Sequence, residues 1–212
     1  MKLHGYFRSS AAYRVRIALN LKGIECEMRA VNLREGEQLR QPFTDMNAQA
    51  LVPVLDTGTE RLIQSLAICE YLDEIRPDPP LLPSDPAARA RARALADIVA
   101  CDVHPLNNLR VLKYLGGELG VSEDDRQRWY HHWVHEGFRA VEATLNEWRT
   151  PGPYCTGDQV TLADVCLVPQ VYNAHRFQVD MSDYPRIRSI HEACEALPAF
   201  KQAHPDNQPD AV

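Results

Sequence analysis

The sequence lacks the cysteine patterns that hold a metal ion or a disulfide frame. Its 212 residues contain six cysteines, with no C-x-x-C pair and no zinc-finger spacing to a histidine. Most of these cysteines stand beside Ile, Val, Leu or Ala, as buried thiols of a reduced protein do. We therefore expect no metal site, no disulfide frame and a cytoplasmic location.

Long apolar runs and a secretory leader are also missing. No stretch approaches the ~20 apolar residues that span a bilayer, and the first residues lack the basic, apolar and small-residue order of a signal peptide. The formal net charge of -6 argues against a general nucleic-acid binder, which is usually basic. We expect neither a membrane nor a nucleic acid as partner.

Short strands alternate with amphipathic helices in the first third of the chain. The expected strands are residues 2–6, 25–31, 52–55 and 61–63. The expected helices are 13–22, ended by Gly23, a less regular 36–46, and 65–75, capped by Ser65. Asp56-Thr57-Gly58 predicts a hairpin turn. The order is therefore βαβ followed by ββα.

The composition changes after this region. Five prolines fall within residues 76–86 and predict a linker. Helical periodicity then dominates, with a long helix over 87–119 that is kinked at Pro105 and a second long helix over 124–148. A capping box at Thr161–Asp164, a helix from Pro185 and an extended tail from Pro205 follow. We predict domains at 1–78 and 87–212, joined by a linker at 79–86, the second domain being all-helical.

Three chain junctions carry side chains suited to an anionic, peptide-like ligand. Ser9-Ser10 and Gln64-Ser65 each precede a helix, where backbone N–H groups and the helix dipole attract negative charge. Such a site lowers the pKa of a bound thiol. A cis bond at Val52-Pro53 would turn the Val52 backbone outward for a peptide to pair with. The alternatives are plain cap residues and an ordinary trans proline.

The same segments resemble the zeta-class glutathione transferases, the family of maleylacetoacetate and maleylpyruvate isomerases. The resemblance covers nearly the whole chain through RSSAAYRVRIALNLKGI (8–24), QALVP (49–53), IQSLAICEYL (63–72), CDVHPLNNLRVLKYL (101–115), GDQVTLADVCLVPQV (157–171) and HPDNQPD (204–210). It implies a thioredoxin-like N-terminal domain, an α/β fold, and an all-helical C-terminal domain. It also implies glutathione as cofactor and a homodimer, in which the N-terminal domain of each subunit faces the helical domain of the other.

The resemblance assigns roles residue by residue. It places Ser9 against the glutathione sulfur with Ser10 beside it, and Ala11 replaces the family's cysteine, which removes a second thiol from the site. The other residues that it implies around glutathione are Gln38, Gln49, Val52, Pro53, Gln64, Ser65, His104 and Asn108. For His104, which precedes Pro105, the residues alone favour a structural histidine.

Three arginines are the candidates for holding a substrate. Arg8, Arg110 and Arg176 resemble the set with which family members hold a dicarboxylate, and a planar, always charged guanidinium suits a carboxylate. Solvent-facing arginines are the usual alternative. The histidines at 131, 132 and 135 share one helix side, but no carboxylate or cysteine completes a ligand set, so we expect a solvated or partner-facing helix there.

The resemblance implies a glutathione-dependent cis–trans isomerase. A thiolate that adds to a cis alkene between carboxylates permits rotation and then leaves, so the enzyme must supply a thiolate, charge for the enolate and carboxylate clamps. The expected substrate is a small dicarboxylate keto acid, maleylacetoacetate, with maleylpyruvate as the alternative. A non-catalytic glutathione-binding protein is the alternative from another class.

Overall fold

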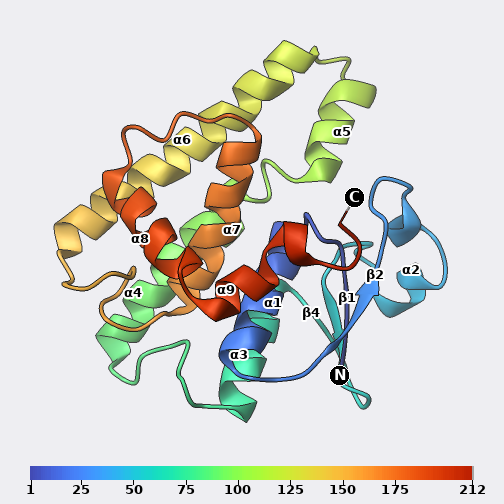
Figure 1. The fold of residues 1–212 in the computed structure, drawn as a ribbon. Coiled ribbons are helices and arrows are strands. Elements are labelled where there is room, and N and C mark those ends of the chain that lie inside the picture. Colours follow the sequence, from blue (N-terminus) through green and yellow to red (C-terminus); the bar gives the residue numbers. More distant parts are fainter. Residues whose placement is uncertain (212) are drawn as a thin grey trace. The chain divides into compact units, whose positions relative to one another are not determined.

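The computed structural model describes residues 1–211, and its elements form two compact units (Figure 1). One unit comprises Met1–Leu81 together with the segment from Glu195 onward, and the other comprises Leu82–Cys194. This grouping differs from the sequence-based boundaries mainly at the C-terminal end, because α9 (Pro198–Ala203) packs against α1 (Ser10–Leu21). None of the helices in the described part of the chain has the length and the apolar composition of a membrane span.

A four-stranded sheet forms the centre of the first unit. Its strands are β1 (Lys2–Gly5), β2 (Glu27–Ala30), β3 (Val54–Asp56) and β4 (Arg61–Ile63), in the spatial order β2-β1-β3-β4. β1 pairs in parallel with β2 and antiparallel with β3, which continues antiparallel to β4. The predicted βαβ–ββα order and the hairpin turn after Asp56 are confirmed.

Helices α1 and α3 (Ser65–Ile75) pack together in this unit. Gly5 permits β1 to approach α1 closely, because a Cβ at that position would lie 3.1 Å from Ala12 Cβ. The expected helix at 36–46 is two short pieces, the 3₁₀-helix η1 (Glu37–Leu39) and α2 (Phe43–Met46), with a cis Gln41-Pro42 bond between them. The proline that lacks a backbone N–H separates the two pieces.

The second unit is all-helical, as predicted. Its elements are α4 (Pro86–Asp97), the π-helix η2 (Ile98–Val103), α5 (Leu109–Gly117), α6 (Glu123–Trp148), α7 (Leu162–Arg176) and α8 (Pro185–Glu195). The expected single kinked helix over 87–119 is wrong. The π-helix ends at His104, whose N–H donates to Val99 O at 3.0 Å. The chain then turns, and Asn108 caps the start of α5.

Buried carboxylates organise the helix starts of this unit. The predicted capping box is confirmed: Asp164 accepts hydrogen bonds from the backbone N–H groups of Cys155 and Thr161, both at 2.8 Å. Complete burial raises the pKa of the Asp164 carboxyl, although these hydrogen bonds act in the opposite direction. Glu142 similarly accepts from the backbone N–H groups of Arg186 and Ile187 at the start of α8.

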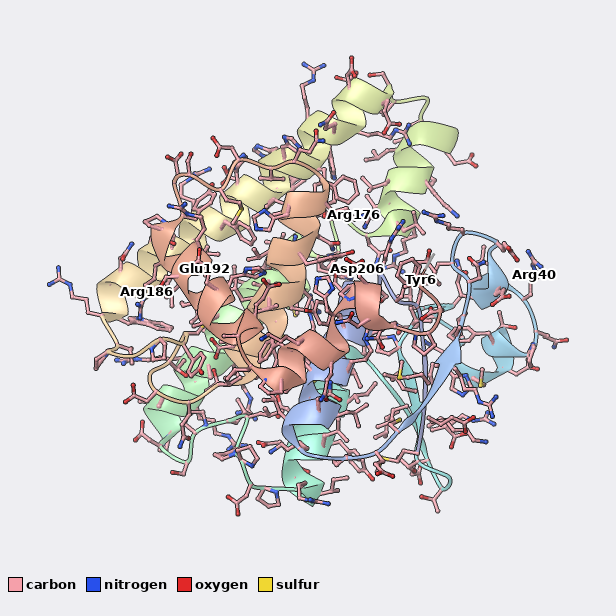
Figure 2. All side chains as sticks on the ribbon, in the orientation of Figure 1. Tyr6, Arg40, Arg176, Arg186, Glu192 and Asp206 are labelled. Carbon is pink, nitrogen blue, oxygen red and sulfur yellow. The ribbon has the colours of Figure 1, made fainter. Side chains whose placement is uncertain are left out.

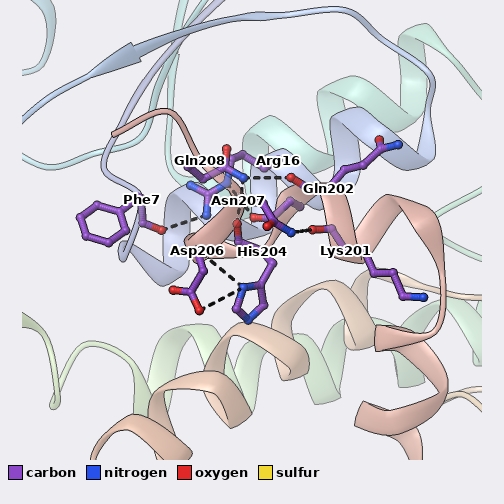
Figure 3. Close-up of polar contacts among 9 residues, drawn as sticks. Phe7, Arg16, Lys201, Gln202, His204, Asp206, Asn207 and Gln208 are labelled. Atoms are coloured by element: carbon purple, nitrogen blue, oxygen red, sulfur yellow. Dashed lines mark hydrogen bonds and ion pairs between the residues drawn. The ribbon is translucent and has the colours of Figure 1, made fainter. Parts of the chain in front are cut away.

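The C-terminal segment is folded, and the predicted extended tail is wrong. Pro205–Asn207 form the 3₁₀-helix η3, and side chains around it bond back to α9 (Figure 3). Asn207 Nδ2 donates to Lys201 O at 2.7 Å, and Gln208 Nε2 donates to Gln202 O at 2.9 Å. Side-chain amides thus satisfy the last carbonyl groups of α9 and keep the tail compact.

Candidate active site

The strand register brings three chain junctions to one edge of the sheet. His4 near the end of β1 pairs with Val54 at the start of β3, and Val54 pairs with Ile63 at the end of β4. The chain therefore leaves β1 towards Ser9, enters β3 from Val52-Pro53 and leaves β4 into Gln64-Ser65 at this same edge. Within the first unit, the structure gathers the three junctions that the sequence singled out.

Ser9 is the N-cap of α1, as its position indicated. Its Oγ accepts a hydrogen bond from the backbone N–H of Ala12 at 3.2 Å. A hydroxyl group that accepts through a lone pair still has its own hydrogen to donate. Ser10 is buried at the first helical position, and Ala11 follows it in the first turn. The Ser9 hydroxyl can thus cap the helix and donate to a ligand at the same time.

Two hydrogen bonds to the backbone of Phe7 fix the loop before Ser9. Phe7 N–H donates to Asp210 Oδ2 at 3.0 Å, and Phe7 O accepts from Arg16 Nη2 at 2.9 Å. Arg16, which is buried, also donates through Nε to Ala203 O at 3.0 Å (Figure 3). The C-terminal segment therefore holds the chain next to Arg8 and Ser9, and sequence analysis missed this contribution of Asp210.

Gln64 has a strained backbone at the start of α3. Its φ is 69° and its ψ is 116°, a conformation that costs a residue with a Cβ about 1–3 kcal/mol and that clusters at functional sites. Its Nε2 donates to Gln49 Oε1 at 2.9 Å, so two candidate residues meet. Gln64 takes the cap position that the sequence assigned to Ser65, which is the first residue of the helix. The Val52-Pro53 bond is cis.

Arg14 lies behind this helix start and was missed by the sequence analysis. Its Nη1 donates to Ser65 Oγ at 3.2 Å, and the residue is 2% exposed. The signal was present in the sequence, because position 14 shares the helical stripe of the apolar residues Ile17, Ala18 and Leu21. An arginine in that stripe predicts a buried cation.

Gln38 belongs to η1 and presents a buried acceptor. Its Oε1 atom is enclosed and has no hydrogen-bond partner among residues 1–211. A buried polar atom without a partner is costly and rare in native proteins, so this carbonyl group fits an incoming N–H donor. Gln38 and the pair formed by Gln49 and Gln64 are thus amide side chains able to bind a peptide.

The helical unit places two further candidates together. His104 Nε2 lies 3.4 Å from Asn108 Nδ2, and Asn108 Oδ1 caps α5 by accepting from the backbone N–H of Arg110 at 3.1 Å. The π-helix before His104 is a type of segment that is frequent at functional sites. The Arg110 side chain is exposed, which fits both a substrate-binding arginine and the solvent-facing alternative.

Arg176 is the last residue of α7 (Figure 2), and its side chain packs on an aromatic ring. Its guanidinium carbon lies 4.8 Å from the centroid of the Phe177 ring, which stacks on Tyr130 with centroids 3.9 Å apart. Burial raises the pKa of the Tyr130 phenol, while nearby Arg176 and a hydrogen bond with Gln170 lower it. The phenol therefore stays neutral beside the Arg176 guanidinium. Arg8 has an equivalent support, 4.8 Å from the Phe7 centroid.

Two of the three histidines on α6, His131 and His135, make structural contacts, which corrects the expectation of a solvated surface at these two positions, whereas His132 is exposed as expected. His131 Nε2 bonds to Phe177 O at 2.8 Å, and His135 Nδ1 bonds to Tyr184 Oη at 2.7 Å. Both contacts join α6 to the segment after α7, so the histidines help to place Arg176. In the described part of the chain, no three His, Cys, Asp or Glu side chains are grouped to hold a metal ion.

Comparisons with known proteins show the family to which this chain belongs. Residues 3–80 match the family model of the glutathione S-transferase N-terminal domain. A probable maleylacetoacetate isomerase of Vibrio cholerae serotype O1 is 54% identical over 99% of this chain and 97% of the relative. A holo structure of a bacterial zeta-class maleyl pyruvate isomerase has a TM-score of 0.98 at 50% identity, with 100% of both chains covered. A maleylacetoacetate isomerase of Methylobacterium extorquens AM1, solved with malonate and glutathione, has a TM-score of 0.97 at 42% identity, again over 100% of both chains.

The strain at Gln64 predicts an inverted order of stability for two substitutions. Gln64→Gly and Gln64→Ala both remove the amide, but only glycine relieves the positive φ. We expect Gln64→Gly to be more stable than Gln64→Ala by about 1 kcal/mol, whereas glycine is ordinarily the less stable of the two. Urea unfolding of both variants measures this difference. An alanine variant as stable as the glycine variant would show that the backbone is not strained.

Proposed function

The chain belongs to the zeta class of the glutathione S-transferase family and is a glutathione-dependent cis–trans isomerase; on that basis we propose that it converts maleylacetoacetate to fumarylacetoacetate. The observation that supports glutathione as the ligand is the gathering of two helix N-termini and the Ser9 hydroxyl at one sheet edge, and the choice of maleylacetoacetate is supported by the relative of that name, which is 54% identical over 99% of this chain. The first turns of α1 and α3 contain no acidic residue. The positive ends of both helix dipoles are therefore available to an anionic ligand.

Glutathione fits the residues of this edge. We propose that Ser9, with Ser10 and Ala11 in the first turn of α1, faces the thiol, and that Val52 and Pro53 hold the peptide backbone. Gln64 and Ser65 receive the γ-glutamyl end. The remaining proposed contacts to glutathione are Gln38, Gln49, His104 and Asn108. The buried Gln38 acceptor and the Gln49–Gln64 bond support this assignment.

The chain's own residues supply charge and orientation for the reaction. When bound, glutathione supplies a thiolate that adds reversibly to the cis double bond and so permits rotation. Ser9 donates its hydroxyl hydrogen towards the sulfur, which together with the dipole of α1 favours the thiolate. Arg8, Arg110 and Arg176 hold the carboxylates of the keto acid and stabilise negative charge that develops on it.

Maleylpyruvate is the second candidate substrate, because the zeta-class relative with a TM-score of 0.98 bears that name. The two keto acids differ in the length of the arm beyond the double bond. Side-by-side kcat/KM values on both acids test the proposal: a preference for maleylacetoacetate supports it, and a preference for maleylpyruvate assigns the chain to the alternative. Binding of glutathione without turnover of either acid would leave a binding protein.

We predict that Ser9→Ala lowers isomerisation at least tenfold while glutathione still binds. The variant loses a hydrogen bond to a charged sulfur, worth about 1.5–3 kcal/mol, and about 1.4 kcal/mol corresponds to a tenfold change in rate. Steady-state kinetics and calorimetric titration with glutathione measure the two effects. Ser9→Thr is the matched control, since it keeps both the cap and the hydroxyl, and should retain most activity. Full turnover by the alanine variant would leave the helix dipole as the only activator.

We predict that the arginines act on the keto acid and not on glutathione. In a chain with a net charge of -6, attraction of a dianion requires local cations. Loss of one charge-assisted hydrogen bond, about 1.5–3 kcal/mol, should lower kcat/KM on the order of ten- to a hundredfold. Arg8→Ala and Arg176→Ala should show this with glutathione affinity nearly unchanged. Higher salt should weaken the preference of the wild type for the dianion.

Arg110→Ala shows which end of the substrate this arginine holds. If Arg110 binds the distal carboxylate, its loss should reduce kcat/KM unequally for maleylacetoacetate and maleylpyruvate. Equal losses of kcat/KM for both acids would mean that Arg110 attracts any anionic substrate. No loss would mean that the shape of the pocket, and not Arg110, determines which substrate is preferred.

We propose a cytoplasmic homodimer, as the family resemblance implies. The six cysteines are free thiols, which suits a reducing compartment. Light scattering at micromolar concentration should give about twice the chain mass of 24.0 kDa. A monomer with full activity would contradict the dimer.

A further inference from the structure

Arg14 is a buried cation without a counter-ion in residues 1–211. Arg14 is 2% exposed, and its Nη1 donates to the neutral Ser65 Oγ at 3.2 Å. Nε and Nη2 have no hydrogen-bond partner among the described residues. Transfer of a charge out of water is strongly unfavourable unless an opposite charge and hydrogen bonds replace the lost hydration. Folding alone therefore leaves this guanidinium poorly compensated.

The place of Arg14 increases that cost. Ser65 is the first residue of α3, so the guanidinium lies beside the positive end of a helix dipole, where a cation is repelled. The first turn of α3 contains no acidic residue that would offset the two positive groups. An external anion at this helix terminus would compensate both of them at once.

We infer that Arg14 is a positioning residue for glutathione: its charge balances the α-carboxylate of the γ-glutamyl residue, and its hydrogen bond orients Ser65. The inference rests on the proposed function, because it takes glutathione as the ligand at this edge. A guanidinium can only donate, so Ser65 Oγ accepts from Arg14 and its own hydrogen is left to donate to the carboxylate. Arg14 itself acts through Ser65 and the local field.

Arg16, two residues further along α1, is the internal contrast. It is also buried, at 3% exposed, but it donates to the backbone carbonyl oxygens of Phe7 and Ala203, which join the active-site loop to the C-terminal segment. These bonds are structural. Two equally buried arginines of one helix thus differ in their bonds: Arg16 donates to two backbone carbonyl groups, and Arg14 donates to one side-chain hydroxyl.

The test compares two peptides on the wild type, Arg14→Met and Arg16→Met. Calorimetric titration measures the Kd of glutathione and of 4-aminobutyryl-Cys-Gly, which keeps the amine but lacks the α-carboxylate. We expect Arg14→Met to bind glutathione at least tenfold more weakly than the wild type does, with the Kd of the decarboxylated peptide changed less than twofold. At saturating glutathione, kcat should stay within twofold of the wild-type value, so that the effect is confined to KM for glutathione.

Arg16→Met controls for damage to the fold. We expect it to lower the unfolding midpoint and to leave the ratio of the two Kd values at the wild-type value. A double-mutant cycle with Ser65→Ala adds a second readout, because the effects of Arg14→Met and Ser65→Ala on glutathione affinity should be less than additive if Arg14 acts through Ser65.

Equal weakening of both peptides by Arg14→Met would overturn the inference and make Arg14 a structural residue. If Arg14→Met does not fold, Arg14→Gln carries the same comparison, since it removes the charge but keeps a donor; an unchanged ratio of Kd values in that variant would also overturn it. A wild type that fails to bind glutathione would instead refute the proposed function, so the two failures are distinguishable.

Discussion

The antiparallel register between β1, β3 and β4 is the constraint on which the rest of the site depends. Because Val54 pairs with both His4 and Ile63, the end of one strand, the start of the next and the end of the third lie at one edge. A shift by one residue would turn every side chain of a strand to the other face of the sheet. The buried core beneath, which includes Leu3, Leu55 and Ile68, prevents that shift.

The helices of this protein differ in whether acidic residues of the chain compensate the positive dipole at their N-termini. α6 begins with Glu123, Asp124 and Asp125, and α7 encloses the Asp164 carboxylate, so the chain itself compensates these dipoles. The first turns of α1 and α3 contain no acidic residue, and both helices start at the sheet edge with the candidate residues. In a chain of negative net charge, the absence of carboxylates at these two places preserves a positive field for a ligand.

The positions of the candidate side chains depend on distant support. Asp210 holds the Phe7 amide across 203 residues of sequence, and His131 of α6 bonds to Phe177 beside Arg176. Neither supporting residue needs to touch a ligand, yet each fixes a loop beside a proposed ligand-binding residue. Rigid support of this kind limits the conformational entropy that binding would otherwise cost.

The sequence by itself determined the four strands, the hairpin after Asp56, the Ser9 cap and the capping box at Thr161, because each follows from side chains within about four residues. The family resemblance added the proposed roles of the site residues. Only the tertiary structure decided the break of the helix at His104, the structural use of His131 and His135, the folded tail, the backbone of Gln64 and the contact of Arg14 with Ser65. The physical reason is distance along the chain: Arg14 meets Ser65 across 51 residues and His135 meets Tyr184 across 49, so no local pattern contains both partners.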